Sequence, residues 1–408
     1  MSDDLGLFTD PDVDVEREQR RRPVKRESAA ARKAKKRKKT ILWIVVGLVL
    51  TLGMGGAYYG YRELRGIGSW DDYSGAGETD VIIEVKDGDP VSEIASTLQK
   101  NNVVASARAF TEASKTDQRV TQIQPGFYVM KTKMSGANAV LRMVDPKSKV
   151  GALQVVGGTI LRDLTGQDGK VVPGIYTQLS QASCTDKNGT KTCVPVEEIK
   201  AAAETADPVA LGVPEWAIAD VKAAPAEFRL EGLIMRGVYQ VNPGLSATEL
   251  LRSVITSSAQ KLQGFGIPSG TADTGFRPYE VLIMSSLVEK EGITKDFGKV
   301  SRVIYNRLKT PMKLQFDSTV NYKLLQPHIR TSDENRNAAG PYNTYATSGL
   351  PPTPIGSPSR EAIEAALKPE AGEWMYFVKC QKDGTSCFAV SKEEHDKNDL
   401  KARQEGVF

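Results

Sequence analysis

The sequence predicts an α+β protein with a single N-terminal membrane helix, and three observations support this fold class. Residues 40–61 contain no charged side chain. Val81, Ile83 and Val85 alternate along one face, as in a half-buried strand. The segment 246–262 repeats apolar residues at helical spacing. With 408 residues, of which 40% are hydrophobic, the chain is long enough for two or more domains with cores of their own.

The first 39 residues carry most of the basic excess of a chain whose formal net charge is only +4. Between residues 17 and 39 there is almost no large apolar side chain, so we expect segment 1–39 to be disordered. A basic run can also indicate a nucleic-acid-binding arm. The apolar segment that follows argues against nucleic acid as a partner and favours a role in membrane topology or in contacts with anionic lipid.

Residues 40–61 are long enough to cross the hydrocarbon core once as a transmembrane helix. A buried helix of a soluble domain is the alternative, but Trp43, Tyr58 and Tyr59 lie near the two ends of the segment, where aromatic residues anchor membrane helices. Because the basic block precedes the span, the positive-inside rule places residues 1–39 in the cytoplasm and residues 62–408 outside. A cleaved signal peptide fits less well, since no clear cleavage site follows.

The four cysteines lie in the outer part as two close pairs, Cys184 with Cys193 and Cys380 with Cys387. Each pair flanks a polar, Gly-containing turn of the kind found at hairpin tips, and disulfides persist outside the membrane. Three pairings are possible, and the local one is favoured. A zinc site is the weaker alternative, because the chain has only two histidines and no C-x-x-C spacing. We expect no metal and no cofactor.

The outer part is expected to begin with a polar, Gly-rich linker at 62–78 and a small module at 79–145. In this module a strand, a turn at 87–90, two helices and a second strand near 126–130 give the order βααβ. Residues 146–408 are expected to form a mixed α/β domain.

A helix is expected at 278–291, because proline stands at its first position and glycine follows its last. Its final residues read V-E-K-E. A helix turns about 100° per residue, so Glu289 and Glu291 point to nearly opposite sides. Glu291 follows Leu287 and Val288 on an apolar stripe, whereas Glu289 is expected on a more polar side.

Burial among apolar side chains and a place at the C-terminal end of a helix both raise the pKa of a carboxyl group. Glu291 is therefore the better candidate for an acid that stays protonated near neutral pH, as a general acid must. The alternative is a structural role, in which Glu291 pairs with Arg302 or Arg307.

Three segments after this helix carry further motifs. They read VSRVIYNRLKTPMKLQFDSTVNY at 300–322, YNTYATSGLPPTPIGSPSREAIEAALKP at 342–369, and YFVKCQKDGTSCFAVSKEEHDKN at 376–398. In this order they closely resemble the YceG-like endolytic murein transglycosylases. The resemblance covers roughly residues 80–408 and the single N-terminal anchor, and it is strongest over 278–398.

The resemblance implies a membrane-anchored lytic transglycosylase that cleaves the MurNAc-β-1,4-GlcNAc bonds of nascent peptidoglycan glycan strands. Such enzymes leave 1,6-anhydroMurNAc ends and terminate strand elongation. In that family the second glutamate of the E-K-E triplet, here Glu291, acts as acid and base. The resemblance also implies a LysM-like first module and suggests peptidoglycan synthases as partners.

The same resemblance implies substrate-binding roles for the residues that match its other motifs. These residues are Asn306, Gln315, Asp317, Tyr342, Asn343, Thr344 and Tyr345. Their structural alternatives are capping for Asn306 and ordinary loop packing for residues 342–345. The chain departs from the pattern at Phe316 and Ser318, where relatives usually carry Thr or Ser and then Pro. It also reads EGLIMRGVY at 231–239, where E-G-x-L-F-P-D-T-Y is usual.

Two other functions remain open from the sequence. Asp317 could be a second carboxylate, which would make the protein a hydrolytic muramidase, because glycosidases use a pair of carboxylates. A non-catalytic, membrane-anchored peptidoglycan-binding scaffold would use the LysM-like module alone.

Overall fold

The computed structural model describes residues 29–64, 70–324 and 331–407. The chain divides into two compact units, Met1–Trp70 and Asp71–Phe408. The observed elements are α-helical and β-stranded in both halves of the second unit, so the mixed α/β class expected from the sequence is confirmed.

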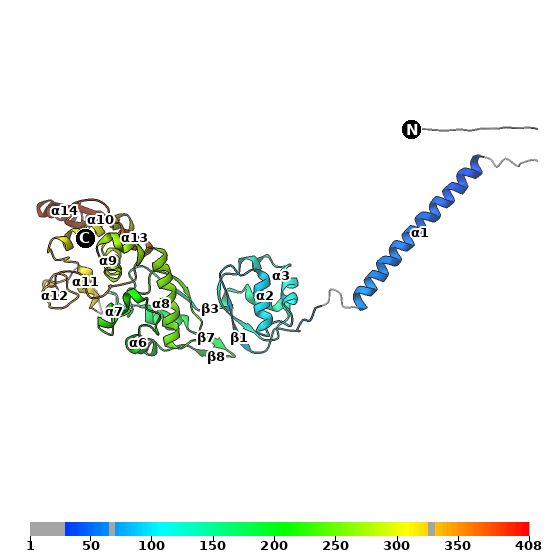
Figure 1. Cartoon of the computed structure of the whole chain (residues 1–408), viewed down its shortest axis with the longest axis horizontal. Helices are drawn as coiled ribbons and strands as arrows, with labels where there is room; N and C mark the ends of the chain where they lie inside the picture. Colours follow the sequence, from blue (N-terminus) through cyan, green and yellow to red (C-terminus); the bar gives the residue numbers. More distant parts are fainter. Residues whose placement is uncertain (1–28, 65–69, 325–330, 408) are drawn as a thin grey trace, which may run out of the picture. The chain divides into compact units, whose positions relative to one another are not determined.

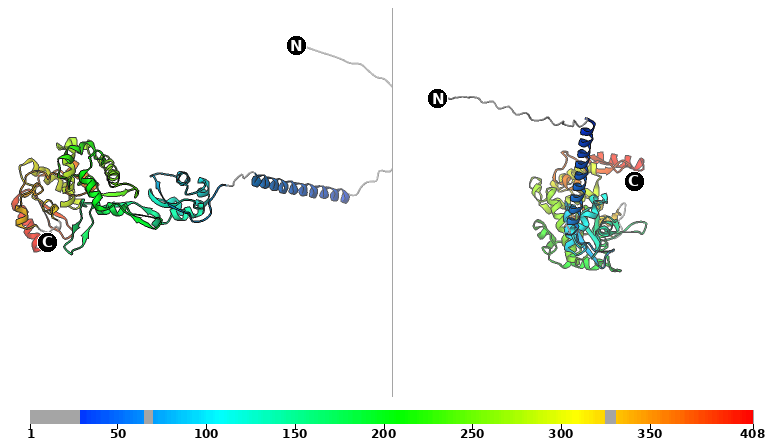
Figure 2. Two further views of the ribbon diagram at one scale, coloured as in Figure 1. Left: turned by 90° about the horizontal axis from the view of Figure 1, so that it is seen from below. Right: turned by 90° about the vertical axis from the view of Figure 1, so that its right-hand side faces the viewer.

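The described part of the first unit is one helix, α1 (Ala29–Leu64), drawn in blue (Figure 1, Figure 2). Its segment Lys39–Tyr61 has a mean hydropathy of 2.0 and is long and apolar enough to cross a membrane. The helix begins ten residues before the expected end of disorder, because alanine, lysine and arginine are strong helix formers and continue it past the apolar segment. The remainder of the basic segment, residues 1–28, lies outside the described residues.

The second unit begins with a three-stranded antiparallel sheet in the order β1-β2-β3. Its elements are β1 (Asp80–Val85), α2 (Val91–Lys100), α3 (Ala107–Ser114), η1 (Gln118–Gln122), β2 (Gly126–Lys131), α4 (Gly136–Met143), η2 (Pro146–Ser148) and β3 (Lys149–Val150). Ile83, Leu98, Phe110 and Met130 fill its core. The βααβ order is present, but a third strand, β3, pairs with β2 beyond residue 145. The sheet therefore has one strand more than expected. A two-residue strand is too short to leave a pattern in the sequence.

Within the described residues, the remaining strands of the second unit form four two-stranded antiparallel ribbons. The strands are β4 (Ala152–Val155) with β9 (Gly237–Gln240), β5 (Leu164–Thr165) with β6 (Val171–Val172), β7 (Thr185–Lys187) with β8 (Thr190–Thr192), and β10 (Tyr376–Lys379) with β11 (Ser386–Ala389). The helices are α5 (Ile175–Ala182), α6 (Val196–Thr205), α7 (Glu215–Ala223), α8 (Ala247–Gly264), η3 (Ser269–Thr274), α9 (Pro278–Glu291), η4 (Thr294–Asp296), α10 (Phe297–Lys309), α11 (Asp317–Tyr322), α12 (Asp333–Asn337), α13 (Arg360–Leu367) and α14 (Lys392–Gln404).

Helix α9 runs through the centre of this core, packed against α10 and α13 (Figure 1). Every residue from Val281 to Val288 is buried. The sequence predicted a more polar side of this helix at Ser285 and Ser286, but both serines are buried. Ser285 and Ser286 donate their hydroxyls to carbonyls of their own helix, at 2.8 Å and 2.7 Å, so they can be buried like apolar residues.

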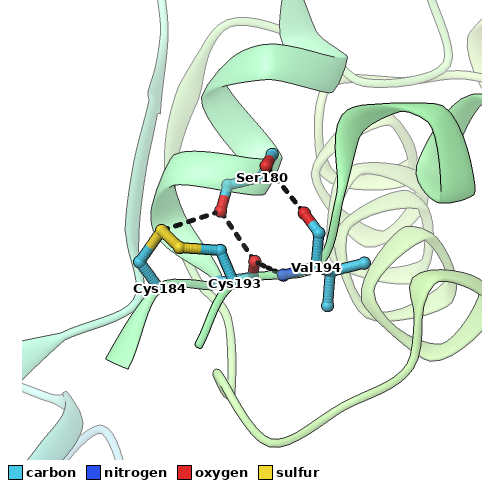
Figure 3. The surroundings of a disulfide bond; sticks show 5 residues. Ser180, Cys184, Cys193 and Val194 are labelled. Carbon is cyan, nitrogen blue, oxygen red and sulfur yellow. Dashed lines mark hydrogen bonds between the residues drawn. A yellow bond between two sulfur atoms is a disulfide. The ribbon is translucent and has the colours of Figure 1, made fainter. Parts of the chain in front are cut away.

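Both cysteine pairs form local disulfides, Cys184–Cys193 and Cys380–Cys387. The first joins the two ends of the β7–β8 hairpin, next to a hydrogen bond of 2.7 Å from the Ser180 hydroxyl to the Val194 carbonyl (Figure 3). The second joins the end of β10 to β11. Each bridge therefore fixes a short hairpin. The strands β7 and β8 carry no apolar residue, whereas Phe377 of β10 and Phe388 of β11 pack against the core.

Candidate functional site

The carboxyl group of Glu291 lies at the end of α9, where this helix meets α11. The residue is half-buried. Burial is the largest influence on the carboxyl group and raises its pKa above the ordinary value. The Ser318 hydroxyl and the charge of Lys379 act in the opposite direction, whereas the charge of Asp317 raises the pKa further. The net effect favours the protonated acid.

The two arginines considered as structural partners of Glu291 bind elsewhere. Arg302 donates to the carbonyl oxygen of Glu370 at 2.6 Å. Arg307 is buried and donates to the carbonyl oxygen of Met375 at 2.7 Å and to that of Leu314. Both guanidinium groups are thus engaged by backbone oxygens. The charge of Arg307 still acts on Glu291, but without a direct hydrogen bond.

Glu289 has a different environment from Glu291, although it is only two positions away. Its Oε2 accepts a hydrogen bond of 2.9 Å from the backbone N–H of Ser359, the residue before α13. A carboxylate at the start of a helix is stabilised by the helix dipole. The intervening Lys290 donates to the Gly158 carbonyl oxygen at 2.5 Å. Glu289 and Lys290 therefore hold neighbouring segments around α9.

Asp317, at the start of α11, is saturated with hydrogen bonds. Its Oδ1 accepts from the Thr331 hydroxyl (2.7 Å), the Tyr345 hydroxyl (2.7 Å) and Arg336 Nε (3.2 Å). Its Oδ2 accepts from the other end of the Arg336 guanidinium at 3.0 Å. Burial alone would raise the pKa of Asp317, but these donors more than offset it, so the pKa lies below its ordinary value. Asp317 is an ionised structural acceptor.

Sequence reasoning missed Thr331 and Arg336, the partners of Asp317. They lie 14 and 19 residues further along the chain, in a stretch that carries no motif. A side chain that acts only through a tertiary contact leaves no local signal in a single sequence.

The loop 342–345 was expected to bind a sugar ring, but most of it is buried. The Tyr342 hydroxyl bonds that of Thr353 at 2.8 Å, and Asn343 Nδ2 donates to three backbone carbonyls. Thr344 accepts the backbone N–H of Phe316 at 2.9 Å. These three residues tie the loop to neighbouring segments, because their polar groups find partners there. Tyr345 is half-buried and reaches Asp317.

Asn306 and Gln315 differ in how far they are available to a ligand. Asn306 Nδ2 donates to the carbonyl oxygens of Gly372 (3.2 Å) and Trp374 (2.9 Å), a structural contact between α10 and the segment before β10 and not the helix cap given as its alternative. Gln315 is exposed, and its φ of 52° lies in the left-handed region that non-glycine residues rarely adopt. Strained backbone of this kind is concentrated at functional sites.

The profile of the YceG-like family matches residues 83–401. The chain belongs to the YceG-like family. An endolytic murein transglycosylase of Bacillus subtilis is 29% identical over 323 residues, which cover 78% of this chain and 84% of that protein. One of Streptococcus pneumoniae is 26% identical over 359 residues, 86% of this chain. The chain spans 63% of the length of the Streptococcus protein.

A solved structure of a putative yceG-like protein from Listeria monocytogenes is also similar. It is 24% identical, with a TM-score of 0.48, and the match covers 78% of this chain and 98% of that one.

This YceG-like chain also buries a second acid, Glu231, which the sequence singled out only as part of an altered motif. Glu231 is fully buried, and its Oε2 accepts from the Tyr322 hydroxyl (2.9 Å) and the Leu161 N–H (3.3 Å). Its Oε1 has no hydrogen-bond partner in the described chain. Burial raises the pKa of Glu231 to about 7. The charges of Lys290 and Arg162 act in the opposite direction.

Proposed function

We propose that this YceG-like chain is a membrane-anchored endolytic lytic transglycosylase. It cleaves MurNAc-β-1,4-GlcNAc bonds within nascent peptidoglycan strands and leaves 1,6-anhydroMurNAc ends, which terminates strand elongation. Family membership and the two relatives named endolytic murein transglycosylases support this activity. The observation that carries it is the contrast between two neighbouring carboxyl groups: burial favours the protonated form of Glu291, and Asp317 is held ionised.

One carboxyl group can perform both halves of such a reaction. Glu291 donates its proton to the glycosidic oxygen while the bond from that oxygen to C1 of the muramyl sugar breaks. The resulting carboxylate then accepts the proton of the C6 hydroxyl, whose oxygen bonds to C1. No water is consumed and Glu291 returns to its starting state. A raised pKa favours the first step, because the acid must be protonated before the substrate reacts.

A hydrolytic muramidase would need a second carboxylate to activate water or to attack the sugar. Asp317 is poorly suited to this task, because its oxygens accept four hydrogen bonds from Thr331, Tyr345 and Arg336. Each donor stabilises the ionised form and lowers its basicity. This arrangement supports lytic transglycosylation over hydrolysis.

The proposal extends to the organisation of the chain. Residues 40–61 anchor it in the cell membrane, residues 1–39 lie in the cytoplasm, and the remainder lies outside, reached through the linker 62–78. The basic residues before the anchor and the two disulfides beyond it support this orientation.

The module 79–145 acts as a LysM-like peptidoglycan-binding domain, and the region 146–408 is catalytic. Glu291 is the catalytic acid and base. Of the residues expected to bind substrate, Gln315 is the strongest candidate for direct contact, because it is exposed and its side chain is directed by an unusual backbone conformation. Peptidoglycan synthases are proposed as partners.

Mass spectrometry of the products formed from uncrosslinked glycan strands tests this function. The samples are the full chain in detergent, Glu291→Gln, and the matched variant Glu289→Gln, with thermal unfolding as the check on folding. We expect anhydromuramyl ends from the wild type and Glu289→Gln, and none from Glu291→Gln. Reducing ends would identify a hydrolase. Strands that the wild type binds but leaves uncut would identify a scaffold.

A further inference from the structure

We propose that Ser318 is a positioning residue for Glu291, whose hydroxyl orients the carboxyl group and donates a hydrogen bond to it after the proton has left. This inference rests on the proposed transglycosylase function and deepens it. It starts from a buried polar group that the rest of the site leaves unused.

Ser318 is the second residue of α11, and the residues on either side of it are fixed. Asp317 accepts four hydrogen bonds, as described above. The Thr319 hydroxyl donates to the Phe316 carbonyl oxygen at 2.7 Å and lies 2.8 Å from the Thr344 hydroxyl. Because both neighbours are held, the Ser318 side chain has little freedom to move away from the end of α9.

The Ser318 hydroxyl is buried, yet it makes no hydrogen bond of normal geometry in the described chain. Ser285 and Ser286 satisfy theirs on carbonyls of the preceding turn of α9. The neighbouring Thr319 likewise donates to the Phe316 carbonyl oxygen, but the Ser318 hydroxyl finds no such acceptor in the described chain. A buried hydroxyl without a partner costs free energy, so its persistence requires an explanation. Helix α11 packs against α9, and the carboxyl group at the end of α9 on which the Ser318 hydroxyl acts is that of Glu291.

A hydroxyl suits a group that changes from acid to base within one reaction, because it both donates and accepts. Protonated Glu291 can donate to Ser318 Oγ. After the proton passes to the glycosidic oxygen, the hydroxyl can turn and donate to the new carboxylate. Hydrogen bonds to an ionised partner are stronger than those between neutral groups. The Ser318 hydroxyl therefore stabilises the carboxylate form of Glu291 more than the protonated form. The backbone N–H of Ser318 also favours the ionised form.

Other charged or titratable groups also act on Glu291. They are Lys290 from α9, Asp317 from α11, Lys379 from β10, Arg307 from α10 and Tyr345 from the loop 342–345. Replacing Ser318 leaves all of them in place, so a change in the pH profile of a Ser318 variant reports on the serine itself.

The test measures kcat, KM and the pH dependence of anhydromuramyl product formation for the full chain in detergent. The variants are Ser318→Ala, which lacks the hydroxyl, and Ser318→Thr, which restores it. Ser301→Ala is the matched control, because Ser301 is a fully buried serine of α10 whose hydroxyl also has no partner in the described chain. Ser301 is not among the groups that act on Glu291.

We expect Ser318→Ala to lower kcat about tenfold, the effect of losing a hydrogen bond to a charged group, with KM unchanged. The alkaline limb of its pH–rate profile should move to higher pH. The carboxylate of Glu291 has lost a stabilising donor, so Glu291 stays protonated up to a higher pH. Ser318→Thr should recover most of kcat, and Ser301→Ala should match the wild type.

A Ser318→Ala variant with the kcat and pH profile of the wild type would overturn the positioning role. A change in KM alone would overturn it as well, because Ser318 would then contact substrate. An equal loss of kcat in Ser301→Ala would also overturn it, because the effect would then come from core packing and not from the Ser318 hydroxyl. Failure of the proposed function is seen separately, as activity that survives Glu291→Gln or as reducing ends in the product.

Discussion

Glu231→Gln is a nearly isosteric change that removes the ability of the fully buried side chain to ionise. The amide oxygen can still accept from the Tyr322 hydroxyl and the Leu161 N–H, which now bind Oε2. The variant therefore isolates the cost of charging this site. We expect it to be more stable than the wild type above neutral pH and similar to it in acid.

The magnitude follows from the pKa of Glu231, which burial raises from 4.5 to about 7. The folded state thus binds a proton more tightly than the unfolded state. As the pH rises from about 4.5 to about 7, the unfolded chain ionises first, and the free energy of unfolding falls. This difference in pKa between the folded and unfolded states corresponds to about 3 kcal/mol of unfolding free energy, which is fully lost at pH values above the folded-state pKa. Glu231→Gln has no such loss.

Urea unfolding of the unit 71–408 at about pH 5 and about pH 8 measures this effect. Trp216 and Trp374 are the only tryptophans in the sequence of that unit, and neither lies in the first module. Trp216 packs against the core that also holds Leu161 and Tyr322, the partners of Glu231, so its fluorescence reports on the unfolding of that core. The stability difference between Glu231→Gln and the wild type should grow by about 3 kcal/mol towards alkaline pH. An equal difference at both pH values would refute the reasoning and mean that Glu231 is ionised, balanced by Lys290 and Arg162.

Three further predictions concern the surroundings of the site. Glu289→Gln should lower the free energy of unfolding by about 1 kcal/mol, since α13 loses a charged partner at its start, and should leave kcat unchanged. Arg336→Ala should lower the free energy of unfolding by about 1 kcal/mol at neutral pH and by progressively less in acid. The reason is that the depressed pKa of Asp317 stabilises the fold only while Asp317 is ionised. Urea titrations at several pH values test this. Replacing Cys380 and Cys387 together by serine should cost about 2 kcal/mol, seen as a lower Tm with unchanged product chemistry.

The limits of α9 could be predicted from the sequence, because proline at its start and glycine after its end are local signals. The raised pKa of Glu291 could also be predicted, because burial is its largest cause. The partner of Glu289 could not be predicted: the Ser359 N–H that engages it belongs to a segment 70 residues further along the chain.

Motifs located the stretches around the site but not the direction of each side chain. The YNTY stretch reads as a polar, aromatic loop suited to a sugar, yet Tyr342 is only 2% exposed and packs against Phe228 and Tyr322. Glu231 lies 91 residues from Tyr322 in the sequence, so its burial depends on contacts that no local pattern records.

The saturation of Asp317 also bears on how readily this fold could change its chemistry during evolution. A hydrolase would need a base that can accept a proton from water, and Asp317 is a nearby carboxylate. Losing Arg336 would remove two of its four donor contacts, but the Thr331 and Tyr345 hydroxyls would still bind Oδ1. Several replacements in separate segments would have to accumulate before water could compete with the sugar's own hydroxyl. In the proposed reaction, a single mutation is therefore not expected to change the product.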